Sequence, residues 1–289
     1  MSSRKIENVD TFLIIGDSHH ICEDYIISGM YPSPYIILGD GCSSSKNTDV
    51  GSRILVHCVK NILTTSLSFD SLISKEDLGY KAIDLARDII NKFDLNLNSL
   101  DSTIIVMFEF KGNIYTYFYG DGHLFLRHKG GSFTSHAFQY KHNAPYYLSY
   151  NLDLKRMTDY QLLMSEEYNK SFTHTVIEGC NSNDFIENNY YENYNSLMPF
   201  IINIEKSDIE YIGIASDGVE SFCKNGDKKN AHSILTEFVA FKNVKGEFVK
   251  RRCKKAIKSE IKDGWKHYDD ISFGAFVIGE DKRCQVENI

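Results

Sequence analysis

Three segments of the chain place an acidic residue at one end of an apolar, strand-like run. They are Tyr35–Gly41 with Asp40, Tyr211–Gly218 with Asp217, and Asp269-Asp270 before Ile271–Ile278. Strands that lie side by side bring their ends together, so these carboxylates can converge at one edge of a sheet. Clustered carboxylates repel one another unless protons or cations neutralise them, and hard divalent cations bind oxygen ligands. The sequence therefore predicts a candidate metal site.

The dipeptide Asp-Gly after an apolar run is also a common turn, so each occurrence taken alone indicates a turn. The chain has four: Asp40-Gly41, Asp121-Gly122, Asp217-Gly218 and Asp263-Gly264. A functional interpretation depends on their combination with two polar segments upstream, Gly16-Asp17-Ser18-His19 and Cys22-Glu23-Asp24-Tyr25.

The elements that would position these residues begin with two strands and two helices. Strands are predicted at Thr11–Gly16 and Tyr35–Gly39. Apolar residues recur at helical spacing from Gly51 to Ile62 and again from Leu78 to Phe93. Ser74, followed three residues later by Asp77, resembles a capping box at the start of the second helix. Helices between strands are typical of a layered α/β arrangement.

The segment from Ser102 to Phe138 predicts a β-meander, because turn residues separate four β-forming runs. The runs are Ser102–Phe110, Ile114–Tyr119, His123–His128 and Ser132–Phe138. Hairpins between consecutive strands of this kind produce antiparallel sheet.

The second half of the chain is less regular. Near 180–196 it is rich in Asn, Tyr and Glu without a usable period, so we predict a loop insertion there. Helices are expected near Ala231–Phe241 and Gly246–Lys262, and a last strand at Ile271–Ile278. Since no internal repeat or clear linker is present, residues 1–289 are expected to form a single α+β domain.

Bulk composition excludes several classes of protein. The net charge of -7 argues against a general nucleic-acid binder. No apolar run approaches the ~18 residues of a membrane helix, so no membrane partner is expected. The 7 cysteines are scattered and contain no C-x-x-C pair, which favours a reducing cytoplasm over a disulfide framework or zinc ribbon.

One stretch, Lys245–Lys266, is strongly basic. A regular apolar stripe favours a helix with a solvated basic face: Val249, Cys253, Ala256, Ile257 and Ile261. The alternative is a docking surface for an acidic partner or a phosphorylated substrate.

Taken in order along the chain, the acidic motifs resemble those of the metal-dependent protein phosphatase 2C family, in a divergent member of bacterial type. The order is Glu23-Asp24, Asp40-Gly41, Ser102-Thr103, Gly120-Asp121, Ser216-Asp217-Gly218 and Asp269-Asp270. The resemblance extends from about Gly16 to Ile278. Each motif is only two or three residues long, so the resemblance depends on their order and spacing together.

The resemblance implies a four-layer α-β-β-α sandwich of two antiparallel sheets flanked by helices, with metal ions between the sheets at one end. It also implies a set of ligands. Asp40 would bridge two ions, and the carbonyl of Gly41 would be a further ligand. Asp217 and Asp269 would complete the coordination of the second ion, and Asp24 would hold the first ion through water. Asp121 would hold a third, more weakly bound ion.

The activity implied by this resemblance is hydrolysis of phosphoserine or phosphothreonine in proteins. A water activated by two cations would attack the phosphorus, and the oxygen-only ligands favour Mg²⁺ or Mn²⁺ over zinc. The implied catalytic residues are Asp40, Asp217 and His19. The implied partners are a phosphorylated protein substrate and a cognate kinase.

The chain departs from the family pattern in two places. Many members carry a histidine after the metal-binding Asp-Gly, as proton donor to the leaving alcohol, whereas this chain has Cys42. Members often carry a phosphate-binding arginine before the early acidic pair, but no arginine lies between Arg4 and Arg53. His19 is the preferred substitute for proton delivery or phosphate binding, although loops also accept histidines that have no role.

These departures leave other functions open. The main alternative is a catalytically weak or inactive phosphatase-like module that binds a phosphoprotein or a regulatory partner. A two-metal hydrolase of another fold, such as a phosphodiesterase, is a third, but such sites usually include histidine ligands. The sequence leaves the substrate and the oligomeric state undetermined.

Overall fold

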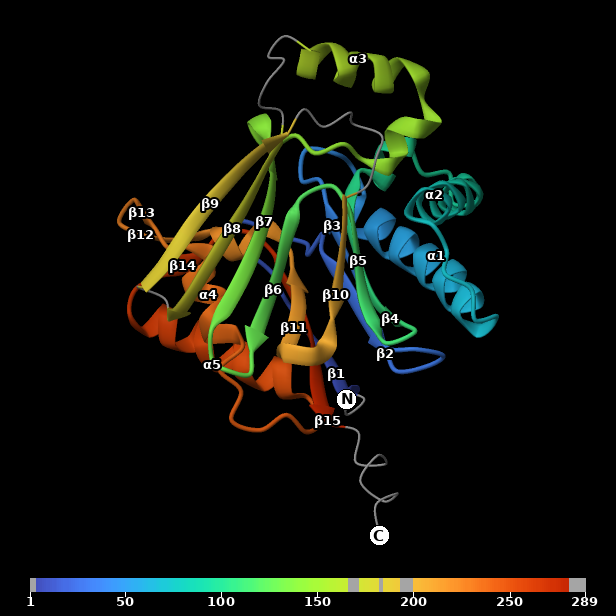
Figure 1. Cartoon of the computed structure of the whole chain (residues 1–289). Coiled ribbons are helices and arrows are strands. Elements are labelled where there is room, and N and C mark those ends of the chain that lie inside the picture. The colour runs from blue at the N-terminus through green and yellow to red at the C-terminus, as the bar shows by residue number, and fades with distance from the viewer. Residues whose placement is uncertain (1–3, 166–171, 182–183, 193–199, 281–289) are drawn as a thin grey trace.

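The computed structural model describes residues 4–165, 172–181, 184–192 and 200–280 (Figure 1). The α-helices of these residues are α1 Thr48–Ser68, α2 Lys75–Lys92, α3 Leu154–Ser165, α4 Ala231–Phe238 and α5 Phe248–Lys262. Their strands are β1 Arg4–Ile14, β2 Tyr25–Gly29, β3 Tyr35–Gly41, β4 Ser102–Phe110, β5 Asn113–Tyr119, β6 Gly122–His128, β7 Phe133–Tyr140, β8 Phe172–Asn181, β9 Asp184–Glu192, β10 Phe200–Glu205, β11 Ile209–Ala215, β12 Phe222–Lys224, β13 Asp227–Lys228, β14 Lys266–His267 and β15 Ile271–Glu280.

Two large sheets form the centre of the molecule. The seven-stranded sheet has the order β1-β15-β11-β6-β7-β8-β9, and the five-stranded sheet has the order β10-β5-β4-β3-β2. All neighbouring strands within them are antiparallel. A small third sheet, β13-β12-β14, lies beside α4 and α5 (Figure 1).

The alternation of side chains along each strand creates three apolar layers. In β3, Ile37 packs with α1 and α2, whereas Ile36 and Leu38 pack between the sheets. In β11, Ile212 faces the space between the sheets and Tyr211 packs with α4 and α5. The layers are therefore α1/α2, five-stranded sheet, seven-stranded sheet and α4/α5, which confirms the predicted α-β-β-α sandwich (Figure 1).

Local sequence signals explain two of the helices. Ser74 caps α2 as predicted, since its side chain accepts a hydrogen bond from the Asp77 N–H at 3.0 Å. In α5 the stripe is buried through Ile257, and Lys254, Lys255 and Lys258 are exposed. Ile261, predicted to face the core, is instead exposed, because Glu260 turns inward and pairs with Lys229.

The predicted β-meander is divided between the two sheets. β4 and β5 belong to the five-stranded sheet, whereas β6 and β7 belong to the seven-stranded sheet. The chain crosses at Gly120-Asp121-Gly122, where both glycines have positive φ, 116° and 126°. Only glycine readily adopts these values, so the crossing depends on its freedom and leaves Asp121 between the sheets.

The prediction of a loop near 180–196 is wrong for the central part of this segment, which forms β9 and pairs with β8. Pairing with a neighbouring strand gives this polar segment a β-conformation that its composition does not indicate. Residues 182–183 and 193–199 lie outside the described part, so the insertion itself stays a prediction.

Among the described helices, none is long and apolar enough to cross a membrane.

Candidate functional site

Backbone contacts join three segments at one end of the seven-stranded sheet. They are the turn that begins at Asp217, the residues just before β15 and the loop after β1. A Cβ atom at Gly218 would lie 1.8 Å from the Asp270 carbonyl oxygen, so only glycine fits there. A Cβ atom at Gly16 would lie 2.4 Å from the carbonyl carbon of Asp269. The ends of β11 and β15 are also joined directly, because the Ser216 N–H donates to the Ser272 carbonyl at 3.0 Å. These contacts fix Asp217 beside Asp269.

A second set of contacts brings the early acidic pair to the end of β3. A Cβ atom at Gly41 would lie 2.9 Å from the Glu23 carbonyl oxygen. On the α1 side, the hydroxyl of Thr48 donates to Glu23 Oε1 at 2.7 Å, and that of Ser52 donates to the Glu23 carbonyl at 2.7 Å. Asp24 is thereby held next to Asp40.

The four Asp-Gly dipeptides have different structures. Asp40 and Gly41 belong to β3 and pair with Thr103 and Ser102, so this dipeptide is not a turn. Asp121-Gly122 forms the crossing between the sheets, and Asp217 starts a 3₁₀ turn to Glu220. Asp263-Gly264 directly follows the end of α5 and forms a turn there, with a positive φ at Gly264.

Four of the acidic residues predicted as ligands gather around a fifth, Asp40. Burial raises the pKa of Asp40 well above its usual value, and the charges of its neighbours raise it further: Asp24, Asp217, Asp121 and Asp269. Burial and the charge of Asp269 likewise raise the pKa of Asp217 to about 6. The pKa of Asp24 and of Asp121 is also raised well above the usual value, chiefly by burial. Concentrating negative charge in this way requires protons or cations to neutralise it.

The donor chemistry fits a hard divalent cation. One atom, Asp24 Oδ2, is buried without a hydrogen-bond partner, and an unpaired buried oxygen of this kind is stabilised by a cation. The neighbouring donors are carboxylates, which suit Mg²⁺ or Mn²⁺. In the described ranges, no three His, Cys, Asp or Glu side chains lie close enough together to hold one ion jointly.

Asp270, adjacent to the predicted ligand Asp269, has a separate structural position. It is buried and accepts hydrogen bonds from the N–H groups of Gly16 at 2.8 Å and Glu23 at 2.6 Å. The His19 ring lies between the two acids, with Nδ1 3.2 Å from Asp270 and Nε2 3.4 Å from Asp269. Burial lowers the pKa of His19, but the hydrogen bond and charge of Asp270 outweigh this effect and raise it overall.

Cys42, at the position where many relatives carry histidine, lies close to Tyr147. The backbone N–H of Cys42 donates to the Asp101 carbonyl at 2.8 Å, which fixes the chain after β3. Tyr147 is buried, and burial raises the pKa of its hydroxyl, with further contributions from Cys42, Asp121 and Asp40. Its hydroxyl group therefore lies near the carboxylates, although no motif in the sequence indicates it.

The structure also brings in an arginine that the sequence did not identify. Arg156, near the start of α3, pairs with the buried carboxylate of Asp101 at 2.8 Å. Asp101 directly precedes the predicted Ser102-Thr103 strand start, which is the only sequence signal for its position. The pair links α3 to the segment that follows Asp40, close to Cys42.

Comparison with known proteins agrees with this arrangement. A family model described as Protein phosphatase 2C matches residues 16–257. No curated protein matches the chain.

Several solved structures share the fold. The serine/threonine phosphatase Stp1 from Staphylococcus aureus has 12% identity and a TM-score of 0.55, over 95% of this chain and 96% of its own. The S. agalactiae serine/threonine phosphatase has 16% identity and a TM-score of 0.54, over 95% and 99%. The catalytic domain of the serine/threonine phosphatase PstP, solved with 2 manganese ions, has 11% identity and a TM-score of 0.52, over 94% and 98%.

Proposed function

This chain belongs to the protein phosphatase 2C family, and we propose that it is a metal-dependent phosphatase that removes phosphate from serine or threonine of a protein. The observation that supports this most directly is the environment of Asp40, which faces four other carboxyls from three loops and the crossing between the sheets. The family match also counts against a two-metal hydrolase of another fold.

The carboxyl cluster would hold Mg²⁺ or Mn²⁺. Two ions would be held by Asp40 and the Gly41 carbonyl together with Asp24, Asp217 and Asp269, and a third by Asp121. When bound, the cations supply a water of lowered pKa and positive charge for the phosphoryl oxygens. The protein contributes by fixing Asp40 in β3 and Asp217 at the start of a 3₁₀ turn, so the acids are positioned before substrate arrives.

His19 is proposed to carry a proton for the leaving alcohol or to bind the phosphate. Asp270 and Asp269 orient its ring and favour its protonated form, which suits either role. Tyr147 is proposed to donate a hydrogen bond near Cys42 and Asp40, because a tyrosine hydroxyl is protonated at neutral pH and burial here raises its pKa further.

The proposed setting is a reducing cytoplasm, with a phosphoprotein as substrate and a cognate kinase as its counterpart. The described cysteines, Cys22, Cys42, Cys58, Cys180, Cys223 and Cys253, are free, which supports that setting.

The test is hydrolysis of p-nitrophenyl phosphate by the purified protein with Mn²⁺ or Mg²⁺. We expect Asp40→Asn and Asp217→Asn to abolish activity, whereas Asp84→Asn, an exposed residue of α2, keeps it. No hydrolysis by the wild type with either metal from pH 6 to pH 9 would reject the proposal.

A second candidate is an inactive module that binds a phosphoprotein. It is favoured by Cys42, at the position where many relatives carry histidine. It is also favoured by the fact that no three His, Cys, Asp or Glu side chains of the described residues are placed to hold one ion together. Calorimetric titration with Mn²⁺ separates the two functions, since a degenerate site binds the ion weakly or not at all.

A further inference from the structure

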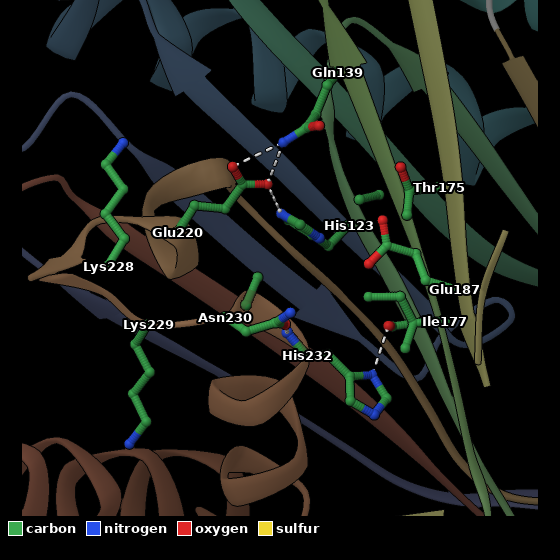
Figure 2. A pocket seen from close by; sticks show the side chains of 13 residues that line it. His123, Gln139, Thr175, Ile177, Glu187, Glu220, Lys228, Lys229, Asn230 and His232 are labelled. Carbon is green, nitrogen blue, oxygen red and sulfur yellow. Dashed lines mark hydrogen bonds and ion pairs between the residues drawn. The ribbon is translucent and has the colours of Figure 1, made fainter. Parts of the chain in front are cut away.

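A second site opens next to the carboxyl cluster, on the face of the seven-stranded sheet that points toward α4. It is a pocket of about 250 Å³ between β7, β8 and β9 on one side and the segment from Glu220 to His232 on the other (Figure 2). The helices α4 and α5 pack mainly behind β1, β15 and β11. The strands at the other edge therefore extend beyond the helices and form the open wall of the pocket.

The pocket shares a wall with the carboxyl cluster. His123 and Glu220 form a pair at 2.9 Å, and Gln139 Nε2 donates to both Glu220 oxygens at 2.8 Å (Figure 2). His123 follows Asp121 by two residues, and Glu220 ends the 3₁₀ turn that Asp217 begins. A group bound in the pocket would therefore lie one side chain away from the cluster.

The pocket is lined by two carboxylates, those of Glu187 and Glu220, and by two lysines, Lys228 and Lys229. Glu187 of β9 is exposed and its carboxylate points toward the space between the walls (Figure 2). Its Oε1 accepts one hydrogen bond, from Asn189 at 3.1 Å, which leaves Oε2 free of described partners. In the same view the ammonium groups of Lys228 and Lys229 point away from β8 and β9, and Lys229 is already paired with Glu260.

A buried histidine without a full set of partners supports a ligand here. His232 is 2% exposed and lines the pocket. Its Nδ1 pairs with the Ser135 hydroxyl at 2.8 Å, but its Nε2 is buried without a hydrogen-bond partner. Buried polar atoms are rarely left unpaired, and such an exception at a pocket wall calls for a ligand or water. Burial lowers the pKa of His232, which favours the neutral ring, and the Nε2 atom of a neutral ring accepts or donates a hydrogen bond according to the tautomer.

The size and lining of the pocket restrict what it can take. Its volume is below the roughly 300–1,000 Å³ of pockets for drug-sized ligands, so one side chain fits better than a cofactor. Ala137 and Ile177 provide apolar surface beside the carboxylates of Glu187 and Glu220. An apolar stem with a cationic head matches this combination.

We propose that this pocket binds an arginine or lysine side chain of the phosphoprotein, a few residues from the phosphorylated serine or threonine, with Glu187 and Glu220 facing its cationic group. The identity of the ligand as part of a phosphoprotein rests on the proposed function. The pocket would then select substrates by a basic residue near the phosphorylated one.

The experiment uses a set of phosphoserine peptides. Each peptide carries Arg, Gln or Glu at one of the three positions before or the three positions after the phosphoserine, and the peptides are otherwise identical. We expect kcat/KM for the best Arg peptide to exceed that of its Gln counterpart about tenfold. Glu187→Gln should remove most of this preference and leave p-nitrophenyl phosphate hydrolysis unchanged. The matched control is Glu178→Gln, an exposed glutamate on β8 that does not line the pocket.

The failures of the two proposals can be told apart. Equal rates for Arg and Gln peptides at every position, or equal losses from Glu187→Gln and Glu178→Gln, overturn the pocket proposal while the phosphatase stands. If the wild type hydrolyses neither peptides nor p-nitrophenyl phosphate, the proposed function fails. In that case the binding of the same peptides, carrying a fluorescent label, is measured by fluorescence anisotropy. Tighter binding of the Arg peptide than of the Gln peptide, lost in Glu187→Gln, supports the pocket proposal. Equal binding of the Arg and Gln peptides overturns it.

Discussion

The Nη2 atom of Arg156 donates hydrogen bonds to both carboxylate oxygens of Asp101, at 2.9 and 2.8 Å. The same carboxylate accepts hydrogen bonds from the hydroxyls of Ser149 at 2.6 Å and Ser45 at 2.7 Å. Asp101 thus joins α3, the segment before it and the segment after Asp40. The position of Cys42 and Tyr147 beside the cluster depends on this buried connection.

Removing the arginine should therefore cost stability. Arg156→Ala leaves a buried carboxylate without its cation, and we expect the free energy of unfolding to fall by about 2–3 kcal/mol, near the lower end for partly buried pairs. Urea denaturation followed by circular dichroism measures this change. Arg87→Ala is the control, because Arg87 pairs with Asp84 on the exposed surface of α2 and should change stability by only about 0.5 kcal/mol. Equal effects of the two substitutions would contradict the structural role.

Gly218→Ala should disrupt the contact between the Asp217 loop and β15. A Cβ atom at this position would lie 1.8 Å from the Asp270 carbonyl oxygen, so the backbone must shift, at a cost of about 2 kcal/mol or more. We expect a lower Tm and, if the proposed function holds, a loss of activity. Gly130→Ala is the matched control, since nothing lies within 4 Å of its Cβ position. A Gly218→Ala protein as stable as Gly130→Ala would contradict the close approach.

Asp40→Asn should stabilise the metal-free protein. The pKa of Asp40 is raised in the folded state. Ionisation of Asp40 therefore lowers the free energy of unfolding as the pH rises above about 4, the pKa of aspartate in the unfolded chain. At pH 7.5 in EDTA we expect the free energy of unfolding of the variant to exceed that of the wild type by about 1–2 kcal/mol. Added Mn²⁺ should reverse this order by stabilising only the wild type. Asp84→Asn should follow the wild type in both conditions.

A partly buried histidine pair between the sheets should make the protein sensitive to mild acid. His136 Nδ1 lies 3.0 Å from His174 Nε2, and burial, followed by the effect of His174, lowers the pKa of His136 to about 4. The unfolded chain therefore binds a proton that the folded chain does not between about pH 6.5 and pH 4, and stability falls across that window by up to about 3 kcal/mol.

Urea denaturation at pH 7.5, 5.5 and 4.5 measures this loss. His136→Gln should reduce it, whereas His20→Gln, in an exposed loop, should leave it unchanged. A wild-type stability that is constant from pH 7.5 to pH 4.5 would contradict a neutral histidine pair in the folded protein.

The sequence predicted elements whose signals are local. The periodic stripe and the Ser74 cap of α2 depend on residues one helical turn apart. The cap is confirmed, and the stripe is buried or partly buried as far as Ile90, whereas Phe93, predicted to belong to it, is exposed and follows the end of the helix. The strand that carries Asp40 was recognisable from its continuous apolar residues, which are typical of a strand buried on both faces. The order of the short acidic motifs was sufficient to identify the family, although the roles of the individual residues stay predictions.

Other features depend on contacts between distant segments. Arg156 pairs with a residue 55 positions earlier, and no periodicity encodes such a pairing. The division of the meander follows from the positive φ of Gly120 and Gly122, yet Gly-Asp-Gly reads equally well as a hairpin turn. β9 has few apolar residues because it is an edge strand, so its β-conformation comes from pairing with β8.

The pairing of β1 with β15 has a consequence for biosynthesis. These strands come from opposite ends of the described chain and lie side by side, and the second of them directly follows Asp269 and Asp270. The ribosome must synthesise the chain through Asp269 and Asp270 before these two acids can reach His19 and Asp40. The carboxyl cluster therefore cannot form around Asp40 while only the segments before β15 have been made.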